Sequence, residues 1–251
     1  MIFDQFKVVI PARYASTRLP AKPLLDICGK PIFWHVVQRV LESGIKIDDI
    51  IIATDDHRIQ AKARELDLPV ILTSVEHISG TDRINEVATR LKWTAKQFVI
   101  NVQGDEPLIP PQLIRQLINF VKSNSQFDIY TAITAINNYD DFINPNVVKA
   151  VTTEYNQAIF FTRSAAPLNR DDLEDFSNAK RHIGIYAYSV KTLSNICNLP
   201  ESMLERIEKL EQLRALSNKL TIGVMEYTAD IPHGIDTDED YIKVKSLMEK
   251  I

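Results

Sequence analysis

The sequence predicts an α/β fold, in which a mostly parallel sheet is flanked by helices. Three observations support this class. Short runs rich in valine and isoleucine alternate with amphipathic helical stretches in the first half of the chain. Those runs are bounded by polar residues, glycine or proline, as buried parallel strands are. The 251 residues, 45% of them hydrophobic and 25% charged, are sufficient for a sizeable buried core.

In the first half we expect buried strands at residues 8–11, 50–53, 70–72 and 98–102. Helices are expected between them. One helix is expected between Pro31, which suits the first helical position, and Gly44, which suits the position just after a helix end. A second follows Asp56 as its cap, and a third opens at the paired prolines 110 and 111. Strands that alternate with helices imply a parallel sheet covered on both faces.

The second half contains fewer helices. We expect strands at 129–136, 147–151 and 158–161, and a strong helix over 205–217. Ser202 and Glu205 stand in capping-box spacing before that helix. A last helix is expected from about Thr237 and Asp238 to the C-terminus. We expect a single domain over 1–251, with a distinct subregion at roughly 130–220.

Bulk properties narrow the possible partners. The net charge of −4 offers no electrostatic footprint for nucleic acid. No apolar run approaches the ~20 residues of a membrane span, and the N-terminus does not resemble a secretory signal. The two cysteines, Cys28 and Cys197, form no metal-binding or redox motif. These features predict a cytoplasmic protein with neither membrane nor nucleic acid as partner.

Glycine is scarce, at 7 of 251 residues, and four glycines lie inside polar motifs. These are Gly80, Gly104, Gly184 and Gly234. Because glycine is so scarce, we expect it at positions where the backbone needs positive φ or comes close to a ligand. Simple turn formation is the alternative at each position.

The loop after the first expected strand, residues 10–23, is strongly basic. Within ten residues it carries three cations and two hydroxyls: Arg13, Arg18 and Lys22, with Ser16 and Thr17. Loops at the carboxyl ends of parallel strands face the ligand crevice, and cations bond strongly to phosphate oxygens. Neither GxxxxGK[ST] nor GxGxxG is present. The loop indicates a nucleotide triphosphate site, with a solvated basic loop as the alternative.

Two acidic motifs are candidate metal ligands. Asp105 follows the strand expected at 98–102, directly after Gly104, and is well placed to hold Mg²⁺ against phosphate oxygens. Asp236 precedes the last helix and is a candidate second ligand. The alternatives are a turn-forming role for Asp105 and a helix-starting role for Asp236.

Further polar residues stand at a helix start and among apolar neighbours. The motif SGTDR, residues 79–83, opens a helix and exposes backbone N–H groups to anionic or carbonyl acceptors, or serves only as a cap. Arg163, in a strand-like apolar stretch, suits a carboxylate ligand. A lone histidine such as His182 is more often a satisfied core residue. The remaining polar residues of this kind are Glu211 and Gln212.

Taken together, these stretches resemble the 3-deoxy-manno-octulosonate cytidylyltransferase family. PARYASTRLPAKPL, ATDD, SGTDR, NVQGDEP, NPNVVKAV, FTRSAAP, RHIGIYAY, LERIEKLEQLR and GIDTDED match it in order, over residues 8 to about 245. The resemblance implies a GT-A-like nucleotidyltransferase fold, a homodimer and Mg²⁺-dependent transfer of CMP from CTP to the anomeric hydroxyl of 3-deoxy-D-manno-octulosonate. Pyrophosphate is released, and the product serves lipopolysaccharide biosynthesis.

The resemblance also implies residue roles. The nucleotide would be held by Arg13, Ser16, Arg18, Lys22, Ser79, Gly80, Arg83 and Gln103. Asp105 and Asp236 would bind the metal and, with Arg13 and Lys22, support catalysis. The sugar acid would be held, in the subregion at 130–220, by Arg163 facing its carboxylate and by His182, Tyr186, Glu211 and Gln212.

One departure from the family pattern concerns the basic loop. The family loop usually reads RLPGKP, and Ala21 stands here in place of that glycine. If the position requires positive φ, alanine strains the loop by ~1 kcal/mol. Otherwise the loop bends differently, or the glycine is not needed for conformation. The placement of Lys22 depends on which of these holds.

Three rival functions remain open on the sequence. The same chemistry on the 8-amino analogue of the octulosonate, or on another sugar acid such as a sialic acid, would leave these motifs unchanged. A non-catalytic nucleotide-binding module would keep the fold without turnover. A glycosyltransferase that uses a finished CMP-sugar would release no pyrophosphate from CTP.

Overall fold

The computed structural model describes residues 5–14, 19–77, 79–232 and 234–250. The chain divides into two compact units. Unit 1 comprises Met1–Ile118 and Asp230–Ile251, and unit 2 comprises Asn119–Ala229. The subregion expected at roughly 130–220 falls within the sequence of unit 2. That the whole chain forms a single domain stays a prediction.

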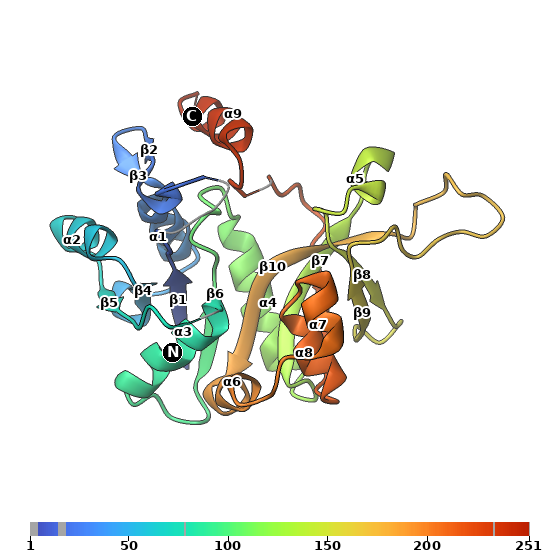
Figure 1. Ribbon diagram of the computed structural model, residues 1–251, viewed down its shortest axis with the longest axis horizontal. Coiled ribbons are helices and arrows are strands. Elements are labelled where there is room, and N and C mark those ends of the chain that lie inside the picture. The colour runs from blue at the N-terminus through green and yellow to red at the C-terminus, as the bar shows by residue number, and fades with distance from the viewer. Residues whose placement is uncertain (1–4, 15–18, 78, 233, 251) are drawn as a thin grey trace. The chain divides into compact units, whose positions relative to one another are not determined.

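The core of unit 1 is a parallel sheet in the order β5-β4-β1-β6 (Figure 1). Its strands are β1 (Phe6–Pro11), β4 (Ile50–Thr54), β5 (Val70–Leu72) and β6 (Phe98–Asn101). The valine and isoleucine side chains at the centre of β1, β4 and β6 have almost no exposed surface, because parallel strands are covered on both faces. The four predicted strands of the first half are confirmed to within two residues.

Unit 1 also contains helices. They are α1 (Ile32–Glu42), α2 (His57–Glu65), α3 (Gly80–Arg90), α4 (Pro111–Ser123), which crosses the sequence boundary of unit 1, and α9 (Asp238–Met248). The Asp56 carboxylate accepts from Arg58 N at 2.8 Å, so the predicted cap is confirmed. Pro31 is the N-cap of α1 rather than its first residue, and Gly44 beyond its end has φ of 96°.

Short elements complete unit 1. They are the 3₁₀ helices η1 (Lys22–Leu24) and η2 (Ile47–Asp49) and the two-residue strands β2 (Asp26–Ile27) and β3 (Lys30–Pro31). The β2–β3 pair could not be predicted from the sequence, because strands of two residues show no periodicity.

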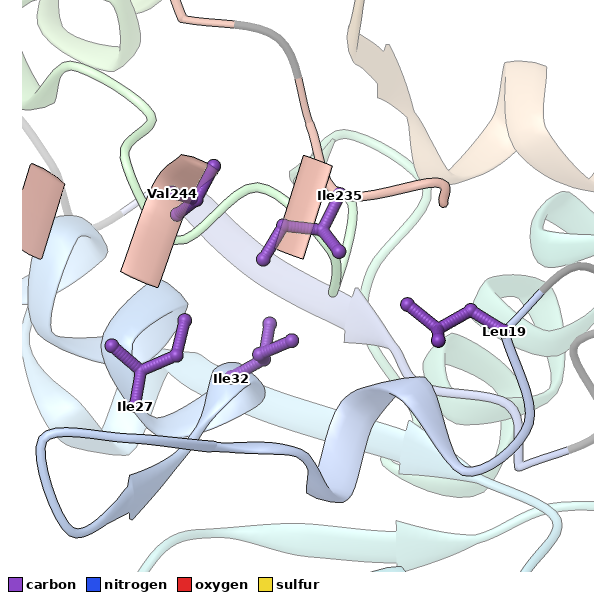
Figure 2. Packing of buried hydrophobic residues seen from close by; sticks show 5 residues of the cluster. All are labelled: Leu19, Ile27, Ile32, Ile235 and Val244. Atoms are coloured by element: carbon purple, nitrogen blue, oxygen red, sulfur yellow. The ribbon is translucent and has the colours of Figure 1, made fainter. Parts of the chain in front are cut away.

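An apolar cluster fastens the C-terminal segment to the region after β1. Figure 2 shows its five buried side chains pointing toward one another: Leu19, Ile27, Ile32, Ile235 and Val244. The capping box predicted for α9 is present, since Thr237 Oγ1 accepts from Asp240 N and the Asp240 carboxylate accepts from Thr237 N. The apolar cluster thereby fixes Ile235, and the capping box fixes Thr237 at the start of α9.

Unit 2 has a mixed sheet. Strand β7 (Ile129–Ala135) pairs in parallel with β11 (Ile222–Glu226) and antiparallel with β10 (Lys180–Ser189). Strand β8 (Lys149–Thr152) pairs antiparallel with β10 and with β9 (Ala158–Thr162). The predicted strands correspond to β7, β8 and β9. A register shift interrupts β10 between Ile183 and Tyr186, beside Gly184.

The helices of unit 2 are α5 (Tyr139–Ile143), α6 (Val190–Cys197), α7 (Met203–Glu208) and α8 (Gln212–Ser217). The single helix predicted over 205–217 is therefore wrong. The capping box at Ser202 and Glu205 is present, but Lys209 has φ of 53° and ends α7 in the left-handed conformation. This break lets Leu210 and Leu213 both turn into the core.

The predicted α/β class, with a mostly parallel sheet and flanking helices, is confirmed. Among the helices that the structure describes, none combines the length and the apolar character needed to span a bilayer.

Replacement of Val244 by alanine tests whether the apolar cluster anchors α9. Val244 is 4% exposed in that cluster, whereas Ile242 on the same helix is 66% exposed. We expect V244A to lower the free energy of unfolding by about 1–3 kcal/mol, because it removes buried carbon and leaves a cavity. The matched I242A variant should change it by less than about 0.5 kcal/mol. Guanidinium unfolding measures both, and equal effects would contradict the anchoring role.

Candidate active site

A pocket of about 270 Å³ lies in unit 1 at the carboxyl ends of β1 and β6. Ligands of open parallel sheets bind at this edge. Five of the residues predicted to hold or activate the nucleotide line it: Arg13, Lys22, Gly80, Gln103 and Asp105. The other lining residues are Pro11, Ala12, Pro23 and Gly104. Ser16 and Arg18, also predicted to contact the nucleotide, lie outside the described residues.

The central feature of the pocket is a lysine between two carboxylates. Lys22 Nζ donates to Asp105 Oδ2 at 2.5 Å and to Asp236 Oδ1 at 3.1 Å. Burial acts to lower the pKa of Lys22, but attraction to the two carboxylates outweighs it, and the pKa is raised above its usual value. The ammonium is therefore charged at physiological pH, and both predicted metal ligands converge on it.

The convergence of Asp236 on Asp105 has a local structural cause. Ile235 N donates to the carbonyl oxygen of Asp105 at 2.9 Å, which joins the C-terminal loop to the loop after β6. Ile235 itself is buried in the apolar cluster of Figure 2. The helix cap is formed by Thr237 and Asp240, and the Asp236 side chain accepts from Lys22 Nζ.

Gly104 is required where β1 and β6 end. A Cβ added there would lie 2.6 Å from the carbonyl oxygen of Pro11, which is backbone and has little room to move. Only glycine permits this approach, so the glycine singled out in VQGDEP has a steric reason. It sets Asp105 directly beside the loop that follows β1.

Ala21 has a left-handed backbone conformation. This residue has φ of 57° and ψ of 18°, in the left-handed region, and forms the N-cap of η1. The backbone therefore adopts the conformation that glycine would favour, and Ala21 carries the strain. Lys22 begins the next turn, so the strained residue directly precedes the lysine that reaches the carboxylates.

Other predicted nucleotide residues are fixed by protein contacts. Arg13 Nη2 donates to the His77 carbonyl oxygen at 2.7 Å. Ser79 caps α3 by accepting from Asp82 N, which is the capping alternative for SGTDR. Arg83 has no exposed surface; it donates to Asp55 at 2.6 Å and to Thr73. The predicted contact of Ser79 and Arg83 with cytidine stays a prediction.

In unit 2 the structure groups predicted sugar residues around the bulge in β10. The His182 and Tyr186 rings lie 5.4 Å apart between centroids. Burial lowers the pKa of His182 to about 3, so the ring is neutral. Burial, and next the negative charge of Glu211, raise the pKa of Tyr186, so its hydroxyl keeps its proton.

A hydrogen-bond chain orients the His182 ring. Its Nε2 lies 2.9 Å from Thr131 Oγ1, and that hydroxyl lies 2.7 Å from the Ile185 carbonyl oxygen. Because a carbonyl only accepts, the hydroxyl donates to it, and Nε2 then carries the proton donated to Oγ1. The other ring nitrogen, Nδ1, is consequently an acceptor.

Gln212 and Arg163 occupy different environments. Gln212 is 8% exposed, and within the described part of the chain its buried Nε2 meets no hydrogen-bond acceptor. Arg163 instead clamps the end of α7, donating from Nε to the Glu208 carbonyl oxygen at 2.6 Å and from Nη1 to that of Pro145 at 2.9 Å. The contact of Arg163 with the carboxylate of a sugar acid stays a prediction.

The sequence did not reveal four residues that support the site. Asp55 and Thr73 hold Arg83, Thr131 orients His182, and Glu208 accepts from Thr162 Oγ1 and Arg163 N. The ATDD motif directly after a predicted strand was a usable signal for Asp55. Thr131 and Glu208 lay inside ordinary strand and helix patterns and gave none.

Comparisons with known proteins identify the family of this chain. The family model described as cytidylyltransferase matches residues 7–222, so the chain belongs to the cytidylyltransferases. It is 48% identical to the 3-deoxy-manno-octulosonate cytidylyltransferase of Cellvibrio japonicus, over 97% of this chain and 98% of the relative. The corresponding enzyme of Alcanivorax borkumensis is 44% identical, over 96% and 97%. The chain therefore belongs to the 3-deoxy-manno-octulosonate cytidylyltransferase family, as its motifs indicated.

Solved structures support the same assignment. A CMP:2-keto-3-deoxy-manno-octonic acid synthetase complexed with CTP is similar at a TM-score of 0.89 and 37% identity, over 98% of both chains. The inositol-1-phosphate CTP transferase of T. maritima has a TM-score of 0.65 at 15% identity, over 97% of this chain and 95% of that one. This second likeness shows a shared nucleotidyltransferase fold.

Restoring glycine at position 21 should relieve the strain before Lys22. We expect A21G to raise the free energy of unfolding by about 0.5–1 kcal/mol, because alanine is disfavoured at positive φ by more than glycine costs in chain entropy. Ala95 is an exposed turn residue without positive φ. The matched A95G variant should lower the same free energy by about 0.5–1 kcal/mol. Chemical unfolding of both variants measures the difference, and the same sign at both positions would refute the strain.

Proposed function

We propose that this protein transfers CMP from CTP to the anomeric hydroxyl of 3-deoxy-D-manno-octulosonate, releasing pyrophosphate and supplying CMP-sugar for lipopolysaccharide biosynthesis. The observation that carries the proposal is the convergence of Asp105 and Asp236 on Lys22, beside the sheet-edge pocket that Lys22 and Asp105 line. Membership of the 3-deoxy-manno-octulosonate cytidylyltransferases supports the choice of both substrates. We place the reaction in the cytoplasm, consistent with the free thiols of Cys28 and Cys197.

The nucleotide side of the reaction rests on the pocket of unit 1. Arg13 and Lys22 supply the positive charge that a triphosphate requires. The anomeric hydroxyl attacks the α-phosphate in line while pyrophosphate leaves. The cations offset charge on the phosphate oxygens, and no covalent enzyme intermediate is required.

Mg²⁺ fits the donor set of this pocket. The carboxylates of Asp105 and Asp236 are hard oxygen ligands, they already share one cation, and their side chains keep 30% and 48% of their surface exposed. We propose that these two residues hold Mg²⁺ together with phosphate oxygens. When bound, the ion would neutralise negative charge that develops on the transferring phosphate.

The sugar side of the proposal rests on unit 2. His182 and Tyr186 are neutral, polar and adjacent, and Glu211 lies near enough to raise the pKa of Tyr186. The buried Nε2 of Gln212 is a donor for which a bound hydroxyl or carboxylate would supply the acceptor. We propose that these residues, with Arg163, recognise the sugar acid.

Pyrophosphate release assayed with CTP, Mg²⁺ and each candidate acid tests the proposal. We expect turnover with 3-deoxy-D-manno-octulosonate, and loss of turnover in D105N by about 10²-fold or more with CTP binding retained, because a metal ligand is removed. Asp238→Asn, on the exposed first turn of α9, should retain activity.

Each rival function gives a different result in the same assay. Turnover with only the 8-amino analogue or a sialic acid would show that this acid is the substrate instead of 3-deoxy-D-manno-octulosonate. No turnover with any acid, but tight CTP binding, would favour the non-catalytic module. Transfer from finished CMP-sugar without pyrophosphate release from CTP would favour a glycosyltransferase. Activity of D105N equal to that of the wild type would reject the metal site.

We further propose that the enzyme is a homodimer formed through unit 2. Met203 and Ile207 lie one turn apart on α7 and are 70% and 69% exposed. Large apolar residues exposed together on one helical face are typical of protein interfaces.

Serine at both positions should disrupt that interface. We expect the double variant M203S/I207S to be monomeric at concentrations where the wild type is dimeric, as measured by light scattering after size exclusion. The control is I242S, which changes an equally exposed isoleucine of unit 1 and should leave the dimer intact. A dimeric double variant would locate the interface elsewhere.

A further inference from the structure

Lys22 contacts both carboxylates that are proposed to hold the metal. Its ammonium lies within hydrogen-bond distance of one oxygen from each metal-binding candidate, at 2.5 Å from Asp105 and 3.1 Å from Asp236. Two carboxylates held this close repel each other unless a cation lies between them. In this structure that cation is the chain's own Lys22.

We propose that Lys22 is an internal counter-ion that competes with the divalent cation for Asp105 and Asp236, and that the triphosphate of CTP draws it away. The inference rests on the proposed function, because it takes Asp105 and Asp236 as the metal ligands. It gives Lys22 a role before the reaction, in addition to its contact with phosphate.

The physical reason is the burial of Lys22. Its side chain is 11% exposed, and it is anchored by the turn of η1 between the left-handed Ala21 and Pro23. A metal ion that bound alone would displace the ammonium from its carboxylates and leave a buried charge without an anion. Such an uncompensated charge is costly. Metal binding without nucleotide is therefore weakened.

A triphosphate removes this cost, because it offers the displaced ammonium a new anionic partner in the same pocket. Metal and CTP should consequently bind with positive coupling. The ion pair also links the C-terminal loop that carries Asp236 to the loop after β6, so Lys22 keeps both ligands positioned before the metal arrives.

Binding of Mn²⁺ alone, measured by electron paramagnetic resonance without nucleotide, tests the competition. We expect K22M and K22Q to bind Mn²⁺ about tenfold or more tightly than the wild type, because the internal competitor is gone. K22R keeps the charge and should bind Mn²⁺ as weakly as the wild type. Thermal melting identifies any variant that fails to fold, and the two neutral variants provide independent tests.

Two controls separate competition from other effects. Arg13→Met removes a cation of the same pocket that bonds to the His77 carbonyl oxygen, and it should change Mn²⁺ affinity little. Equal tightening in R13M and K22M would overturn the inference, since the effect would then arise from general charge. So would Mn²⁺ affinity in the folded neutral variants that is unchanged or weaker.

The D105N variant distinguishes this inference from the proposed function. If D105N abolishes Mn²⁺ binding while the neutral Lys22 variants show no tightening, the metal site stands and the counter-ion role fails. If D105N and D236N leave Mn²⁺ binding unchanged in both the wild-type and K22M backgrounds, the metal assignment itself fails.

Discussion

The geometry of the nucleotide pocket depends on one constraint: carboxylates that are far apart in sequence must meet at one cation. Asp105 follows strand β6 of unit 1, whereas Asp236 lies in the C-terminal segment. The backbone bond from Ile235 N to Asp105 O fixes the approach. The apolar cluster containing Ile235 supplies the burial free energy that holds the returning segment in place (Figure 2). Charge alone would not, because the cost of taking the Lys22 ammonium out of water offsets much of the attraction.

Two backbone positions bring the partners within reach. Gly104 lets the loop after β6 approach the Pro11 carbonyl oxygen, and Ala21 turns left-handed immediately before Lys22. The first position requires glycine for steric reasons. The second holds alanine in the left-handed region, a conformation that glycine adopts at lower energetic cost. Strain at such a position persists only because the surrounding contacts determine the conformation.

The sequence predicted what local pattern determines. Buried parallel strands, the Asp56 cap and the capping box at Thr237 have signals within a few residues, and all are present. The break at Lys209 had no such signal, because helical spacing continues through it and no glycine or proline marks it. Partners such as Asp55 for Arg83 are selected by the fold, and sequence separation gives no information about them. The residue types of the pocket were therefore predictable, while their hydrogen-bond partners were not.

The two groups of site residues differ in electrostatics in a way that matches their proposed ligands. In unit 1, Arg13 and Lys22 carry full charges, and a triphosphate is an anion that such charges stabilise. In unit 2, burial keeps His182 and Tyr186 neutral, and neutral donors and acceptors suit the hydroxyl groups of a sugar. A charged His182 would need an anion inside an apolar setting, at a large desolvation cost. The single acceptor nitrogen left on its ring would accept from a hydroxyl of the proposed sugar ligand.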